Sequence, residues 1–161
     1  MKVEQLMMKN AGACRPESTL DDAARIMWER DCGFVPVIES ERSAKVVGVI
    51  TDRDACMAAY TRGAGLKDLR VADAMAKVVW SCAPSDSIEE AERRMTEARV
   101  RRLPVVDDGG QLLGVLSLAD IAREAFQERT RSKPEVKQAD VGGLLGSVCQ
   151  PRQLAAGASA S

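Results

Sequence analysis

Two pairs of residues in the sequence combine a hydroxyl with a carboxylate three positions further along the chain. They are Thr51 with Asp54 and Ser117 with Asp120. Each pair lies where an apolar run gives way to a helical pattern, so both side chains are expected on one side of a first helical turn. The amides and positive dipole end of such a turn attract phosphate, and an aspartate can accept hydrogen bonds from both hydroxyls of a ribose. The same spacing also suits plain helix capping, with the hydroxyl as N-cap and the acid stabilising the first turn.

The composition argues against several other chemistries. The 161 residues include no histidine, which removes the commonest neutral-pH general base and the commonest metal ligand. We therefore expect no catalytic residues, no metal site and no enzymatic activity. Lys and Arg number 23 against 24 Asp and Glu, so the net charge of −1 gives no bulk attraction to nucleic acid or anionic lipid. Neither nucleic acid nor a membrane is expected as a partner.

The cysteines and the first residues bear on the compartment. The five cysteines are odd in number and never form a C-x-x-C pair, which is typical of a reducing environment. The opening segment, MKVEQLMMKN, carries charges and lacks the apolar run of a secretory signal, and no stretch of the sequence approaches the length of a membrane span. We expect a soluble, cytoplasmic protein.

A long segment of the sequence occurs twice. At an offset of 68 residues the matched pairs include Val3 with Val71, Met7 with Met75, Cys14 with Cys82, Pro16 with Pro84, Ala23 with Ala91 and Pro36 with Pro104. After a loop that is two residues shorter in the second copy, V-G-V-I-T-D-R-D (47–54) aligns with L-G-V-L-S-L-A-D (113–120) at an offset of 66. The two hydroxyl–carboxylate pairs therefore occupy equivalent positions in a duplicated unit.

Each copy predicts the same order of elements, β-α-β-β-α. A short extended piece ends before a proline, and a helix with capping-box spacing begins after Thr19 or Ser87. Two β-rich runs follow, joined in the second copy by a D-D-G-G turn that favours a hairpin, and a second helix closes the copy. The expected ranges are 11–14, 20–27, 35–38, 46–50 and 52–60 in the first copy, and 78–82, 88–95, 103–106, 112–116 and 118–128 in the second.

This pattern predicts an α+β fold in which two pseudo-symmetric β-α-β-β-α repeats pack as one module. We expect the first repeat at 1–61, the second at 71–129, and a linker at 62–70 that begins with a flexible R-G-A-G segment. From about residue 130 onward no helical or strand period appears, and the last residues are alanine, glycine and serine. Residues 130–161 are therefore expected to form a disordered tail.

The doubled unit resembles a tandem pair of CBS (cystathionine β-synthase) domains, known as a Bateman module. The resemblance is carried by h-P-V-h at 35–38 and 103–106 and by G-h-h-[TS]-x-x-D at 48–54 and 114–120, and it covers about residues 1 to 128. It implies a regulatory module, often a dimer, that binds adenosyl ligands in two clefts between the repeats. No cofactor is required, and an adenine nucleotide (AMP, ADP or ATP) is the expected regulatory ligand.

The resemblance also implies that each cleft combines the [TS]-x-x-D of one repeat with strand residues of the other. The first expected site consists of Thr51, Arg53, Asp54, Ser81, Cys82, Arg101, Arg102, Leu103 and Pro104. The second consists of Ala13, Cys14, Phe34, Val35, Pro36, Ser117 and Asp120. Backbone groups beside the two prolines are expected to bind the adenine edge, because a proline leaves strand groups unpaired. Core packing is the alternative for the neighbouring Val35 and Leu103.

The two clefts are predicted to differ in charge. Arg101 and Arg102 can clamp phosphates in the first cleft, whereas the strand residues of the second, 32–35, contain no cation. The first cleft is then expected to prefer ADP or ATP, and the second to bind a less charged adenosyl group or to stay empty. A solvated strand end is the alternative explanation for the two arginines.

The expected function is that of a regulatory protein that binds an adenine nucleotide, changes the relation of its repeats, and signals to an unidentified effector protein. A homodimer is expected. The alternative function is a ligand-free scaffold that dimerises or docks on a partner through apolar helix faces. A third hypothesis is a redox switch through Cys14 and Cys82, for which burial as small apolar side chains is the competing explanation.

Overall fold

Hydroxyl residues start four helices of the computed structural model, which describes residues 1–150 of the chain. The N-cap side chains of Thr19, Thr51, Ser87 and Ser117 each accept a hydrogen bond from the backbone N–H three residues further on. The helices that begin there are α2 (Leu20–Glu29), α3 (Asp52–Arg62), α4 (Ile88–Ala98) and α5 (Leu118–Glu128). The expected helices of both copies are confirmed, because each starts where the capping pattern predicts.

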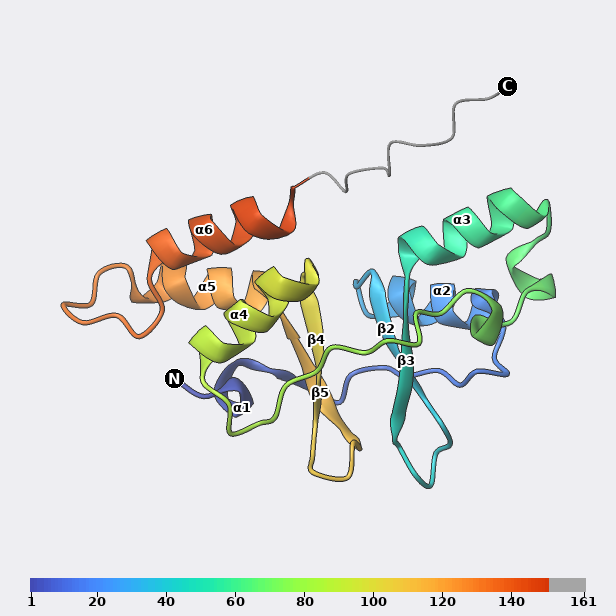
Figure 1. The fold of residues 1–161 in the computed structure, drawn as a ribbon, viewed down its shortest axis with the longest axis horizontal. Coiled ribbons are helices and arrows are strands. Elements are labelled where there is room, and N and C mark those ends of the chain that lie inside the picture. The colour runs from blue at the N-terminus through green and yellow to red at the C-terminus, as the bar shows by residue number, and fades with distance from the viewer. Residues whose placement is uncertain (151–161) are drawn as a thin grey trace.

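Two antiparallel hairpins form the sheets of the two halves (Figure 1). Their strands are β2 (Phe34–Ile38) with β3 (Val46–Thr51), and β4 (Arg102–Val106) with β5 (Leu112–Ser117). The registers are equivalent, since Phe34 lies opposite Thr51 and Arg102 lies opposite Ser117. Each extended piece that we expected before a proline is reduced to a single parallel bridge to β2 or β4.

The chain crosses between the halves twice, in equivalent ways. The first crossing segment contains helix α1 (Val3–Leu6) and strand β1 (Met8–Lys9). This segment lies on the second half, where Met8 pairs with Val115 of β5 (Figure 1). The equivalent residue of the second copy, Ala76, pairs with Val49 of β3 in the first half. Each half is completed by a segment of the other copy, so the two sequence repeats interlock.

The connection between the copies is ordered. It contains two short 3₁₀ turns, η1 (Leu66–Asp68) and η2 (Val71–Asp73). The carbonyl of Leu69 accepts a hydrogen bond from the backbone N–H of Leu20 at the start of α2, 2.9 Å away. Leu69 and Val71 are buried in the core of the first half. The linker expected at 62–70 therefore packs on the first half through the residues that follow the segment 62–65, which was expected to be flexible.

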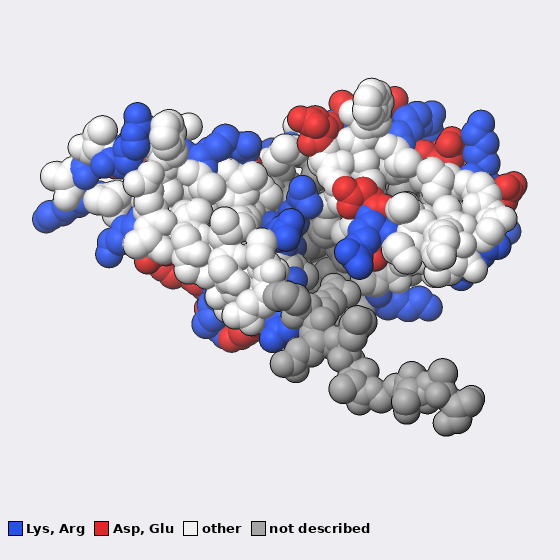
Figure 2. Space-filling view, turned by 90° about the horizontal axis from the view of Figure 1, so that it is seen from above, with Lys and Arg blue, Asp and Glu red and all other residues white. Residues whose placement is uncertain are grey.

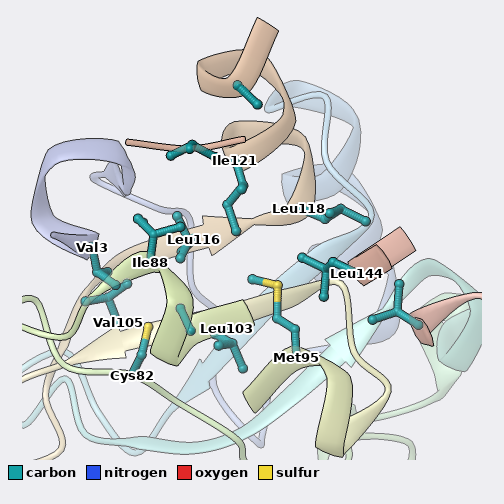
Figure 3. Packing of buried hydrophobic residues seen from close by; sticks show 14 residues of the cluster. Val3, Cys82, Ile88, Met95, Leu103, Val105, Leu116, Leu118, Ile121 and Leu144 are labelled. Atoms are coloured by element: carbon teal, nitrogen blue, oxygen red, sulfur yellow. The ribbon is translucent and has the colours of Figure 1, made fainter. Parts of the chain in front are cut away.

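Each half has its own hydrophobic core. The first contains Cys14, Leu20, Ala23, Met27, Val35, Val37, Ile50, Ala55, Leu69 and Val71. The second includes Val3, Cys82, Ile88, Met95, Leu103, Val105, Leu116, Leu118 and Ile121, whose side chains from the sheet and the helices meet in Figure 3. The buried face of each helix follows the spacing read from the sequence.

A further helix, α6 (Gln138–Val148), covers the second half. Its Leu144, labelled in Figure 3, and its Val148 are buried in the second core. The helix lies beside α4 and α5 (Figure 1). The expectation of a disordered tail is therefore corrected over residues 138–148, while 151–161 lie outside the described residues. The sequence pattern did not reveal this helix because three glycines interrupt it and only a narrow apolar stripe remains.

A buried carboxylate fixes the loop that leads into α6. The side chain of Glu128, at the end of α5, is fully buried and accepts hydrogen bonds from the backbone N–H groups of Glu135 at 2.7 Å and Val136 at 2.9 Å. It also pairs with Arg131. The hydrogen bond from Val136, with those from Glu135 and Arg131, holds the pKa of the Glu128 carboxyl below its ordinary value. The ionised acid thus supplies a hydrogen-bond partner to two loop amides that would otherwise be unpaired.

The close approach of strand β1 to strand β5 depends on Gly114. A Cβ atom on Gly114 would lie 2.5 Å from the carbonyl oxygen of Met8. We expect Gly114→Ala to displace β1 and lower the free energy of unfolding by about 1–3 kcal/mol, as overpacking does. Urea denaturation measures the change. Gly142→Ala is the matched control, because nothing lies within 4 Å of its Cβ; equal stability of the two variants would contradict the prediction.

Candidate functional site

A cleft of about 140 Å³ is lined by residues of both copies. From the first copy and its crossing strand come Met8, Ala11, Gly12, Arg30, Asp31, Cys32 and Phe34. From the second copy come Arg102, Val115, Ser117, Ala119, Asp120 and Arg123. On the face seen in Figure 2, Lys and Arg side chains gather in the hollow between the two halves. The cleft therefore combines a hydroxyl–carboxylate pair, an aromatic ring and three guanidinium groups.

Ser117 and Asp120 are held together by a reciprocal capping box at the start of α5. The Oδ2 atom of Asp120 accepts hydrogen bonds from the Ser117 N–H at 2.8 Å and the Ser117 hydroxyl at 2.6 Å, and the Asp120 N–H donates to Ser117 Oγ at 3.2 Å. The Oδ1 atom pairs with Arg123, one turn further along α5. The capping role is thus present, and Oδ1 is the carboxylate atom whose exposed partner can be exchanged for a ligand hydroxyl.

Thr51 and Asp54 form the equivalent capping box at the start of α3. The Oδ2 atom of Asp54 accepts from the Thr51 hydroxyl at 2.6 Å and from the Thr51 N–H at 3.1 Å. The surroundings differ according to the repeat alignment, because Trp80 stands at the position of Gly12 and Met57 at that of Arg123. The two hydroxyl–carboxylate pairs are therefore locally alike and set among different neighbours.

Arg102 lines the cleft of Ser117 and Asp120. The hairpin explains this position, because residues that lie opposite each other in a ladder project to the same face of the sheet. The family resemblance places Arg102 in the cleft of Thr51, and the run 32–35 that enters the cleft of Ser117 contains no cation. The structure corrects the place of Arg102: Arg30, Arg102 and Arg123 line the Ser117 cleft, although the run 32–35 itself carries no cation. Arg30 is held at the rim by donating to the carbonyl of Asn10 at 2.8 Å.

Arg101, the other predicted phosphate clamp, is engaged elsewhere. Its guanidinium donates to the Sγ atom of Cys149, just past the end of α6, at 3.2 Å. Because α6 was not expected, this contact was not expected either. Arg53 is an exposed residue of the first turn of α3.

The remaining predicted site residues belong mostly to the interior. The buried ones are Cys14, Val35, Pro36, Cys82, Leu103 and Pro104. The carbonyls of the two prolines already accept hydrogen bonds, from the N–H groups of Cys14 and Cys82, each at 3.1 Å. Ala13 and Ser81 are half-buried and do not line the cleft. Of the residues predicted for the second site, the structure brings together Phe34, Ser117 and Asp120.

The cleft residues that the sequence did not reveal differ in how they could have been found. Arg123 lies three residues after Asp120, and this helical spacing already places the two side chains together. The hairpin pairing likewise places Arg102 beside Ser117. Arg30 and Met8 enter the cleft only because α2 ends there and because β1 crosses to β5. No local pattern carries that information.

The two equivalent cysteines are poorly suited to redox chemistry. Burial raises the pKa of the Cys14 and Cys82 thiols to about 12 each. The reactive thiolate is therefore scarce at neutral pH. The two side chains also belong to different cores, which favours their role as small apolar residues.

Residues 1–150 contain neither a candidate metal cluster nor a candidate membrane-spanning helix. In this part of the chain no cluster of three or more His, Cys, Asp or Glu residues is arranged to hold a metal ion. No helix there is both long and apolar enough to cross a membrane.

The family follows from comparison with known proteins. The family model named CBS domain matches residues 3–60 and again 71–126. The chain belongs to the CBS domain family. These two matches coincide with the duplicated unit, so the resemblance read from the sequence is confirmed, as is the mixed helix and sheet fold with two CBS repeats.

Individual relatives support the same conclusion. The CBS-domain chain is 32% identical over 152 residues to a 17.7 kDa protein of Acidianus ambivalens, which covers 92% of this chain and 88% of that one. It is 32% identical over 155 residues to inosine-5′-monophosphate dehydrogenase of Methanocaldococcus jannaschii, covering 95% of this chain and 28% of the enzyme. It is also similar to the solved structure of CBSX2 in complex with AMP, with 28% identity, a TM-score of 0.66, and coverage of 80% of this chain and 98% of that chain. The shared CBS pair is a regulatory module and not a catalytic fold.

Proposed function

We propose that this CBS-domain chain is a regulatory module that binds an adenine nucleotide in the cleft of Ser117 and Asp120. The proposal rests on one observation above all: both copies contribute to a cleft that unites this pair with Phe34 and three arginines. The aspartate suits the ribose hydroxyls, the arginines suit phosphate, and the ring of Phe34 suits the base. The relative solved with AMP supports an adenosyl ligand.

Binding requires side chains at the cleft to move. The volume of about 140 Å³ is below the roughly 300–1,000 Å³ of ligand pockets. The side chain of Arg123 is 66% exposed, so its ion pair with Asp120 is weak and can open at little cost. Once the Oδ1 atom of Asp120 is released, it accepts a ribose hydroxyl while Arg123 turns to phosphate. The arginines favour ADP or ATP over AMP.

The ligand would act by fixing one arrangement of the two copies. A molecule held by residues of both copies stabilises the arrangement it fits, and an effector protein that contacts both then responds to occupancy. The surroundings of Thr51, Asp54 and Arg53, which line neither of the two described pockets, remain a second proposed site. We propose that it binds less tightly, because Met57 replaces the cation that Arg123 supplies in the other cleft.

Thermal unfolding in the presence of AMP, ADP, ATP and S-adenosylmethionine tests the proposal. A ligand at about a hundred times its Kd stabilises the folded state by about 2.7 kcal/mol, which raises the Tm by roughly 5–10 °C in a chain of this size. We expect ATP or ADP to give the largest shift. No shift with any of the four would contradict nucleotide binding and favour the ligand-free scaffold.

A matched pair of variants locates the site. Asp120→Asn is expected to weaken ATP binding by about 10- to 100-fold, because a charge-assisted hydrogen bond to ribose is worth about 1.5–3 kcal/mol. Asp54→Asn makes the same change in the equivalent capping box. It is expected to change the Kd of ATP for the principal site by no more than about twofold, because Asp54 does not line the cleft. Isothermal titration calorimetry measures both. Loss of binding only in Asp54→Asn would place the principal site in the other cleft.

A further inference from the structure

Glu92 of helix α4 carries a carboxylate oxygen that is buried and unpaired. Its Oε1 atom is closed off from solvent, and no group within residues 1–150 donates a hydrogen bond to it. The side chain also takes part in no ion pair in this part of the chain. A buried charge that loses its hydration without gaining a partner is costly. The ionised side chain therefore destabilises the arrangement that buries it.

The arrangement that buries Glu92 is the packing of α6 across α4 and α5 (Figure 1). The charged groups that act on Glu92 within residues 1–150 are Asp140, in the first turn of α6, and Glu89, three residues earlier on α4. Both are acids, and α5 adds no charge to them. Burial raises the pKa of the Glu92 carboxyl above its ordinary value, and the two acids raise it further. The interface between α4 and α6 thus holds like charges.

The first half shows what this surface is like without a covering helix. Ala24 of α2 stands at the position equivalent to Glu92. In the described part of the chain no further α-helix covers α2 and α3, and Ala24 lines an open groove there. This half nevertheless has its own buried core. A repeat can therefore fold without such a cover, so α6 can separate from the second half without unfolding it.

Helix α6 adds little to its own stability. Three glycines, at positions 142, 143 and 146, lie within its 11 residues, and each weakens a helix. Its N-cap residue, Lys137, makes no capping hydrogen bond through its side chain. A helix of this length is marginal in isolation, so α6 depends on the burial of Leu144 and Val148 in the second core. A charge placed at the same interface opposes that burial directly.

We propose that α6 is a detachable cover of the second half, and that protonation of Glu92 controls its docking. With Glu92 protonated, the interface with α6 is uncharged at that point and the helix is held. With Glu92 ionised, the carboxylate repels Asp140 and regains water when α6 leaves, so the helix separates more often and uncovers α4 and α5. This device does not involve the nucleotide cleft and goes beyond the proposed function.

The direction of the pH dependence follows from the raised pKa of Glu92. A proton is held more tightly when α6 is docked, so the added stability is fully present below the ordinary carboxyl value of 4.5 and is lost as the pH rises through the raised pKa. The buried Glu128 has the opposite shift, because hydrogen bonds from loop amides lower its pKa. It therefore stays ionised between about pH 5 and pH 8 and does not mask the effect of Glu92.

Hydrogen exchange of the full chain without nucleotide tests the proposal. We expect the protection factors of the α6 amides to fall by at least about fivefold between about pH 5 and pH 8, with no such change in α2. Glu92→Gln removes the charge and keeps the shape. It should raise the protection of α6 at the higher pH by at least about fivefold and abolish the pH dependence. Glu97→Gln is the matched control, because Glu97 is an exposed residue of the same helix, paired with Arg93.

Two results would overturn the proposal. One is the same pH dependence of α6 protection in Glu92→Gln as in the unchanged chain. The other is a gain of protection in Glu92→Gln that is equally large in α2, since the substitution would then act on the whole fold.

Limited proteolysis at a single pH gives a second readout. Lys137 is exposed and directly precedes α6, and a protease can cut there only when the neighbouring backbone opens. Trypsin should cleave after Lys137 at least about fivefold more slowly in Glu92→Gln than in the unchanged chain or in Glu97→Gln. Equal rates in the three chains overturn the proposal. Neither measurement uses nucleotide, so the outcome is independent of the proposed function.

Discussion

Replacing Arg102 with alanine is expected to weaken ATP binding by about 10- to 100-fold, since a hydrogen bond between charged groups is worth about 1.5–3 kcal/mol. Arg102 lies opposite Ser117 in the β4–β5 ladder and lines the proposed cleft. Among residues 1–150 its side chain takes part in no ion pair, so no carboxylate competes with a phosphate. Adenosine has no phosphate, so its Kd for the variant should be within about twofold of its Kd for the unchanged protein.

The neighbouring arginine supplies the control for this experiment. Arg101→Ala removes the same charge one residue away, but the Arg101 guanidinium contacts Cys149 and does not line the cleft. Calorimetry at two salt concentrations measures both variants with ATP and with adenosine. If Arg101→Ala and Arg102→Ala weakened ATP binding to a similar extent, the positive charge would act through the overall electrostatic field of the protein and not through direct contact. If Arg102→Ala bound ATP with unchanged affinity, the proposal that the phosphates lie in this cleft would be wrong.

Leu144→Ala is expected to lower the free energy of unfolding by about 2–5 kcal/mol, the range for a leucine truncated inside a core. Leu144 is 4% exposed and belongs to the second core together with residues of α4 and α5 (Figure 3). The loss combines the apolar area returned to water with the cavity left between α6 and the helices beneath it. A loss of this size would show that α6 is packed as part of the folded core of the second half.

The adjacent leucine is the matched control. Leu145 is 49% exposed on the same helix, so Leu145→Ala should change stability by no more than about 0.5 kcal/mol. Urea denaturation gives the free energies, and hydrogen exchange at the amides of α6 reports whether the helix opens locally. Equal effects of the two substitutions would show that α6 does not dock through Leu144.

The elements that the sequence predicted correctly are those whose signals are local. Thr19, Thr51, Ser87 and Ser117 each start a helix, because a hydroxyl can bind the free amides of the next turn whatever surrounds it. The hairpins form where β-rich runs flank a short connection. The extended pieces before the prolines were overestimated, because the proline restricts only its own neighbour and supplies no partner strand.

The site was predicted less completely because it is made of residues far apart in the chain. Ser117 and Asp120 were found through their spacing, and Phe34 through the family resemblance. Arg102 was assigned to the wrong cleft. In the hairpin register it lies opposite Ser117, so the two side chains share one face of the sheet. Arg30 carries no sequence signal for the cleft at all, since its position depends on where α2 ends relative to the other half.

The sequence by itself determined the duplication, the starts of the helices, the two hairpins and the family, because each of these depends on residue types at fixed short spacing. The tertiary structure decided that the N-terminal strand completes the opposite half, that Arg102 faces Ser117 and Asp120, and that α6 covers one helical face and leaves the other open. These features depend on contacts between residues distant in the chain, where burial and close approach, as at Gly114 and Leu144, select the partner.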